Sequence, residues 1–147
     1  QLVKDYLNKG MRIGVKGGDD FVDVRDVASA IITIADKEIL NEHFILSNRY
    51  YSVKRMMGIL HELTGLHQVK VNLPVGLIKM VLPFKLIDDK RRHKISLYTA
   101  DSLKILNSNA SFSHQKAESQ LDYHPRDIRE TFIQLIHRLS PQKYPMA

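Results

Sequence analysis

The sequence contains no cysteine, and this absence excludes two kinds of structure. Neither a disulfide framework nor a zinc site with thiolate ligands can form without that residue. Long apolar runs are also missing. The longest, residues 73–84, is interrupted by two prolines and a lysine, and is shorter than the roughly 20 residues of a membrane span. No basic and apolar leader opens the chain, so we expect a cytoplasmic location and no membrane partner.

Motifs for catalysis or cofactor binding are scarce as well. The glycines near the start lack the Gly-x-Gly-x-x-Gly spacing, and Asp19 and Asp20, which follow them, would repel a phosphate. The seven histidines form no His-x-x-x-His pair, and no Gly-x-Ser-x-Gly is present. Of the nearby acids Asp20, Asp23 and Asp26, the last is expected to cap a helix. The residues therefore indicate no catalytic group, no cofactor-binding group and no metal ligand.

What is present is typical of one soluble globular unit. The 147 residues are 44% hydrophobic and 26% charged, enough for one domain with a core of its own. The net charge of +6 includes one dense basic cluster without interleaved aromatic residues, which single-strand nucleic-acid binders use for stacking. We interpret this cluster as a solvated loop and do not expect nucleic acid as a partner. Its members are Lys90, Arg91, Arg92, His93 and Lys94.

Hydrophobic spacing predicts strands that alternate with helices in the first half and mostly helices in the second. A glycine turn at residues 17–20 is expected to join two strands into a hairpin. Ser52 is expected to cap a helix that ends at Gly65, and Asp127 to cap the last one. The predicted fold class is α/β. The expected strands are residues 12–16, 21–24, 43–47 and 69–73, and the expected helices begin near residues 2, 26, 53, 75, 99, 113 and 128, with a loop at 85–98.

One segment, Phe-Val-Asp-Val-Arg-Asp-Val-Ala at residues 21–28, resembles the strand-to-helix junction of extended short-chain dehydrogenase/reductases. The resemblance is to the dihydroflavonol-reductase-like group of the NAD-dependent epimerase/dehydratase superfamily. Four further segments resemble the same group: residues 44–52, Leu73-Pro74, residues 106–117, and residues 121–126, where Asp122 replaces a usual glycine in a turn with positive φ. The resemblance therefore extends over nearly the whole chain.

This resemblance implies that residues 1–147 are the C-terminal portion of a Rossmann-type enzyme. The N-terminal half, with its NAD or NADP site and its Ser/Tyr/Lys catalytic set, would be absent and would be the partner of this portion. The portion would bind a small-molecule substrate, bind no cofactor alone and be inactive alone. The parent would be an NAD(P)-dependent oxidoreductase acting on a carbonyl or alcohol. Apolar surface that once faced the other half should cause self-association or reduced stability.

Tyr50 and Lys54 imitate the catalytic Tyr-x-x-x-Lys of these enzymes. That chemistry needs both side chains on one helix turn, where the lysine lowers the pKa of the tyrosine. Because Ser52 is the expected cap, Tyr50 lies outside the helix. The family also places its tyrosine before the Val-Asp-Val-Arg-Asp segment. We therefore interpret the spacing as coincidental.

The substrate class can be narrowed by charge. At the same junction, nucleotide-sugar epimerases have a segment similar to Arg-Asp-Tyr-Ile-His-Val, whose arginine binds a diphosphate. The corresponding residue in this chain is Asp19, which has the opposite charge. The apolar residues after Pro74 favour a small apolar or aromatic carbonyl compound, although ordinary core packing explains them equally well. The candidate pocket residues are Asp19, Phe21, Leu77, Ile78 and Val81.

Two other interpretations stay open at this point. The chain could be an independent binding or interaction module whose basic loop contacts nucleic acid or another anionic partner. It could also be a regulatory domain that uses the fold without catalysis. Enzyme activity of the isolated chain is left undecided.

Overall fold

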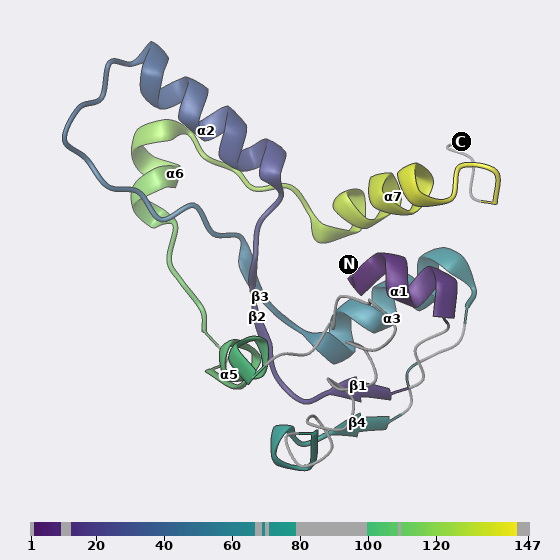
Figure 1. Cartoon of the computed structure of the whole chain (residues 1–147). Coiled ribbons are helices and arrows are strands. Elements are labelled where there is room, and N and C mark those ends of the chain that lie inside the picture. Colours follow the sequence, from purple (N-terminus) through teal and green to yellow (C-terminus); the bar gives the residue numbers. More distant parts are fainter. Residues whose placement is uncertain are drawn as a thin grey trace.

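The computed structural model describes residues 2–9, 13–66, 69, 71–78, 100–108 and 110–143. Figure 1 shows two lobes joined by a two-stranded ladder. The fold is mixed α/β with a mostly helical second half, as the sequence predicts. The larger lobe contains α1 (Leu2–Lys9), β1 (Ile13–Val15), α3 (Val53–Thr64), β4 (Val71–Leu73) and α7 (Ile128–Leu139); the smaller contains α2 (Val24–Asp36) and α6 (Gln115–Leu121).

The joining ladder is antiparallel and pairs β2 (Gly18–Phe21) with β3 (Arg49–Ser52). Beside β2 lies α5 (Ala100–Ser108). A second, parallel pair unites β1 and β4, with Ile13 opposite Val71. The predicted hairpin of the first two strands is therefore wrong. Gly17 has φ +119° and sends the chain from one sheet to the other, while its carbonyl accepts a hydrogen bond from the Val53 N–H (2.9 Å).

The start of α2 also differs from the prediction. The second strand ends at Phe21, so the helix begins at Val24 and its N-cap is Asp23, whose carboxylate accepts from the Arg25 N–H. The predicted cap, Asp26, lies within the first helical turn and is buried. The prediction was wrong because it extended the strand through Val24, although the strand partner ends earlier.

Residues 43–47 were expected to form a strand, and they do not. Their side chains still alternate: Phe44 and Leu46 pack against the core of the smaller lobe, whereas Ile45 is exposed. The alternation of buried and exposed side chains is therefore present although the strand is not. The segment pairs with no strand in the described part of the chain, so no ladder forms.

Helix ends with a local chemical signal are confirmed. Ser52 caps α3 by accepting from the Arg55 N–H, and Gly65 ends that helix in the left-handed conformation. Asp127 caps α7 through the Arg129 N–H. Asp122 has φ +55° at the end of α6, which confirms the expected turn with positive φ.

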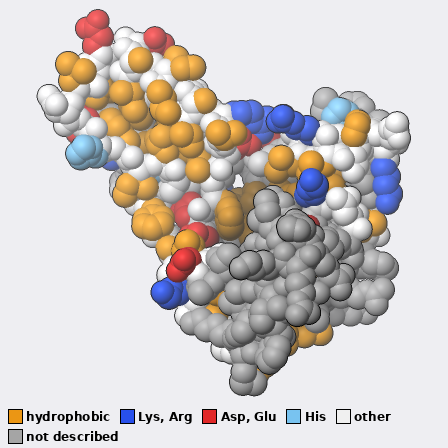
Figure 2. Space-filling view, in the orientation of Figure 1, with side chains coloured by type: hydrophobic (Ala, Val, Ile, Leu, Met, Phe, Trp, Pro, Cys, Tyr) orange, Lys and Arg blue, Asp and Glu red, His pale blue; other side chains and the backbone are white. Residues whose placement is uncertain are grey.

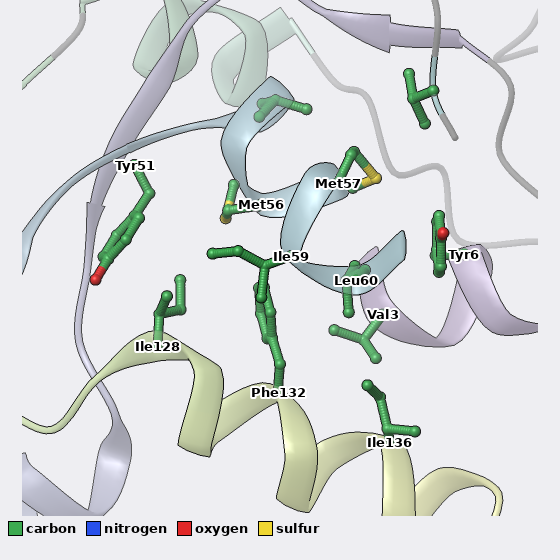
Figure 3. Packing of buried hydrophobic residues seen from close by; sticks show 12 residues of the cluster. Val3, Tyr6, Tyr51, Met56, Met57, Ile59, Leu60, Ile128, Phe132 and Ile136 are labelled. Atoms are coloured by element: carbon green, nitrogen blue, oxygen red, sulfur yellow. The ribbon is translucent and has the colours of Figure 1, made fainter. Parts of the chain in front are cut away.

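Three hydrophobic clusters hold the two lobes. Figure 3 shows the largest, in which side chains of α1, α3 and α7 pack together. The second cluster joins β1 to α5 and contains Val15, Val75 and Leu103. The third holds α2 against α6 and contains Ala30, Ala117, Leu121 and Tyr123. The main residues of the first are Val3, Tyr6, Met56, Ile59, Leu60, Phe132 and Ile136.

Several expectations fall outside the described residues. Of the helix predicted at residues 75–82, residues 75–78 are helical, and residues 79–82 lie outside the described part of the chain. The predicted loop at 85–98 lies entirely outside, as does the basic cluster within it.

Replacing Gly17 with alanine should lower the free energy of unfolding by more than about 2 kcal/mol, because positive φ is strained for alanine. The new Cβ would also overlap the Leu106 carbonyl oxygen. Gly58→Ala is the matched control: it lies inside α3 with open space around it, and should stabilise by about 0.5–1 kcal/mol. Urea denaturation measures the free energy of unfolding of both variants. Equal effects of the two substitutions would contradict the conclusion that position 17 requires glycine.

Candidate functional site

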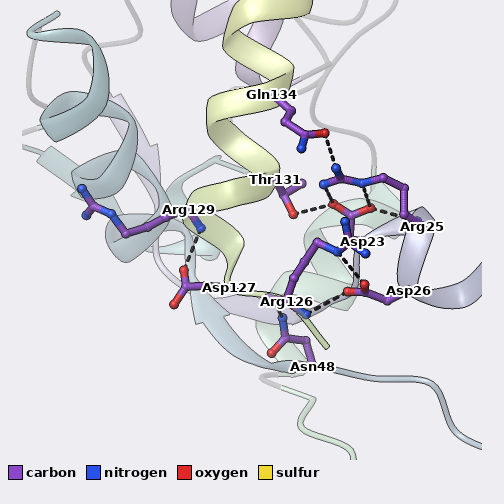
Figure 4. Close-up of polar contacts among 9 residues, drawn as sticks. All are labelled: Asp23, Arg25, Asp26, Asn48, Arg126, Asp127, Arg129, Thr131 and Gln134. Atoms are coloured by element: carbon purple, nitrogen blue, oxygen red, sulfur yellow. Dashed lines mark hydrogen bonds and ion pairs between the residues drawn. The ribbon is translucent and has the colours of Figure 1, made fainter. Parts of the chain in front are cut away.

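Two aspartates at the start of α2 tie that helix to the chain before and within α7. Asp26 accepts from Arg126 twice, from Nε at 2.6 Å and from the backbone N–H at 3.0 Å (Figure 4). Only 6% of the Asp26 surface is exposed, so its charge has little access to water. A buried carboxylate needs such a partner, and here the partner is 100 residues away in sequence.

Asp23 makes the second connection. Its carboxylate accepts from the Arg25 backbone N–H (2.9 Å), from the Arg25 guanidinium (2.6 and 2.9 Å) and from the Thr131 hydroxyl of α7 (2.6 Å). Arg25 also donates to the Gln134 side chain on α7 (Figure 4). The hydrogen bond from the Arg25 side chain holds the pKa of Asp23 well below its usual range, although burial opposes this shift.

Asn48 and Asp20 extend the network into the ladder. The Asn48 amide donates to the Arg126 carbonyl (2.8 Å), and the Asn48 N–H donates to Asp20 (3.0 Å). The other oxygen of Asp20 accepts from the Phe112 N–H (3.2 Å). Four separated parts of the chain therefore meet around three carboxylates, which we call the aspartate junction (Asp20, Asp23 and Asp26).

The aspartate junction holds distant parts of the chain together, and its carboxylates are poorly suited to proton transfer. All three carboxylates already accept hydrogen bonds, and the pKa of Asp23 is far below the range that suits a general base at neutral pH. Tyr123 is nearby and buried, and burial raises its pKa to about 12, so its phenol stays protonated. Across the described residues, no three acidic or histidine side chains gather as metal ligands would.

An apolar groove of about 390 Å³ lies next to the junction, between α1, the end of β2 and α7. Its size is in the range that holds small organic molecules. Its polar lining residues are Lys4, Asp23, Asn48 and Thr131, and the remaining lining residues are hydrophobic. The hydrophobic side chains lining it are Leu2, Val3, Phe21, Val22, Met56, Ile128, Phe132, Leu135 and Leu139.

The predicted pocket residues do not gather at one place among the described residues. Phe21 lines the groove, whereas Asp19 lies in β2 opposite Tyr51. Leu77 is half-exposed. Ile78 packs on the second hydrophobic cluster, which agrees with the alternative of ordinary core packing. Val81 is outside the described part. The substrate pocket of these five residues therefore stays a prediction.

Sequence reasoning missed the partners of the junction: Arg126, Asn48 and Thr131. Arg126 belongs to a segment that carries the family resemblance, but no spacing links it to Asp26. Tyr50 and Lys54 are separated as expected, since Tyr50 lies in β3 and Lys54 in α3. In the described ranges, every helix falls short of the length and apolar character needed to cross a membrane.

Comparison with known proteins finds likeness to parts of two longer proteins. Sterol demethylase protein B of Methylococcus capsulatus is 24% identical over 138 residues, which are 92% of this chain and 42% of that protein. The crystal structure of gox2253 superimposes on the whole chain with a TM-score of 0.70 at 21% identity, over 44% of its own length. No protein-family model matches. The chain thus spans less than half of each, and the structural likeness establishes a shared fold.

Asp26→Asn should lower the free energy of unfolding by about 2 kcal/mol, because a charge-assisted contact is lost and Arg126 keeps a partly buried charge. Arg126→Met should cost a similar amount, and the double variant less than the sum of the two. Glu42→Gln is the control. It breaks the ion pair with Lys116, in which both side chains are nearly half exposed, and should cost below about 1 kcal/mol. Additive effects of the first two variants would contradict the coupling.

The low pKa of Asp23 predicts acid sensitivity. The unfolded chain binds a proton at Asp23 at higher pH than the folded chain does, so this contribution to stability is present near neutral pH and is lost below about pH 4. Asp23→Asn keeps an oxygen that can cap α2 but removes the charge. Urea denaturation between pH 7 and pH 3 should show a shallower decline for this variant. Parallel curves for the variant and the wild type would exclude the contribution.

Proposed function

We propose that this chain is the C-terminal, substrate-binding portion of an NAD(P)-dependent oxidoreductase of the extended short-chain dehydrogenase/reductase type. The portion contributes a surface for a small carbonyl or alcohol substrate. A preceding Rossmann half supplies NAD or NADP and the catalytic Ser/Tyr/Lys set. By itself the chain is inactive.

The parallel pair of β1 and β4 carries this proposal. Parallel strands occur almost entirely inside larger sheets that are covered on both faces, and a pair of three-residue strands has little stability of its own. In the described part of the chain these two strands pair only with each other. A parallel sheet supplied by another part of the protein would be completed by them.

Length and surface support the same conclusion. The matching proteins are more than twice as long as the stretch they share with this chain. The apolar groove suits a substrate with a hydrophobic body, and the name of one relative refers to a sterol.

The alternative of an anion-binding module depends on the basic cluster at residues 90–94. Those residues are outside the described part, and no described feature favours this function.

The full-length natural protein tests the proposal. The sequence before Gln1 should contain a Gly-rich turn after a strand and a Tyr-x-x-x-Lys. The full-length protein should quench NADH or NADPH fluorescence and oxidise the cofactor with an aromatic or sterol ketone, while residues 1–147 alone should do neither. The control replaces the upstream tyrosine with phenylalanine, which should retain cofactor binding and lose turnover. Cofactor binding by residues 1–147, or none by the full-length protein, would refute the proposal.

A further inference from the structure

Helix α2 carries apolar residues around most of its circumference. One side is buried: Ala30 packs on α6, and Asp26 belongs to the aspartate junction. At 100° per residue, a second arc spans about 100° on another side of the helix, and its apolar residues are exposed. This apolar arc of α2 consists of Val24, Ala28, Ile31, Ile32 and Ala35.

The exposure of the arc is large. Val24 is 77% exposed, Ile32 60% and Ile31 58%. Figure 2 shows hydrophobic side chains gathered over the lobe that contains α2. Helix α3 differs, since Lys54, Arg55 and Glu62 occupy its exposed positions. An exposed apolar arc on a helix usually marks a surface that another part of a protein covers, so the arc needs a cover.

Two observations indicate what covers it. The parallel pair of β1 and β4 needs further strands, and the matching proteins extend well beyond the region they share with this chain. The arc itself carries no charge, and the charged residues of α2 lie outside it, at Arg25, Asp26 and Asp36. An uncharged arc suits permanent burial within one chain better than a transient contact.

We propose that the apolar arc of α2 docks against the part of the same protein that precedes Gln1. This inference rests on the proposed function, because the covering part is the proposed Rossmann half. The helix then lies at the centre of the assembled enzyme, with α6 on one side and the preceding half on the other. The aspartate junction fixes the orientation in which the arc is presented.

Cysteine labelling of the full-length protein tests this docking. Residues 1–147 contain no cysteine, so an introduced thiol is unique within them. Ala28→Cys places a thiol in the arc, and Ser29→Cys places one at the next residue, outside the arc; both positions are exposed in this structure. With the preceding half attached, maleimide should modify Ala28→Cys at least about tenfold more slowly than Ser29→Cys. In denaturant the two rates should agree. Peptide mass spectrometry separates these thiols from any in the preceding half.

Equal labelling rates in the native full-length protein would overturn the docking. Protection of Ala28→Cys that disappears on dilution would also overturn it, because a second copy would then be the cover. Protection that is independent of concentration supports it. Cofactor binding is measured separately: an enzyme that binds NADPH and labels equally at both positions retains the proposed function and loses only the docking surface.

Discussion

The buried carboxylates of Asp23 and Asp26 are the constraint on which the arrangement of the two lobes depends. A charge removed from water must be paired and hydrogen-bonded, and both aspartates lie at the first turn of α2, where the smaller lobe meets the larger. Asp26 is paired with Arg126 and Asp23 with Arg25 and Thr131. Such pairs add little net stability over an apolar contact, but they tolerate few alternative geometries, so they specify one orientation of α2 relative to α7.

This orientation has consequences on both sides of the junction. Toward α7 it places Asp23 and Phe21 at the apolar groove. It also leaves the apolar arc of α2 exposed. Together with a parallel strand pair of only three residues per strand, these surfaces describe a molecule whose hydrophobic faces exceed what its own described elements cover. The proposed preceding half would cover all of these surfaces as one additional body.

Local signals in the sequence were sufficient to predict those helix ends whose conformation depends on residues only a few positions away. Ser52 and Asp127 begin helices because their side chains reach N–H groups two or three residues away. Gly65 and Asp122 end helices because they tolerate positive φ.

By itself, the sequence determined the mixed α/β class and most helix ends. Only the tertiary structure decided the strand partners, because β1 pairs with β4 across more than fifty residues and a hairpin between β1 and β2 would have used the same glycines. It also decided the role of Asp26. From the sequence, Asp23 and Asp26 are equally suitable as the N-cap of this helix. In the structure Arg126, 100 residues later, pairs with Asp26, so Asp26 forms a buried ion pair instead of a cap. Spacing encodes neighbours along the chain, whereas the pairing of a buried charge depends on which distant groups the fold brings within hydrogen-bonding distance.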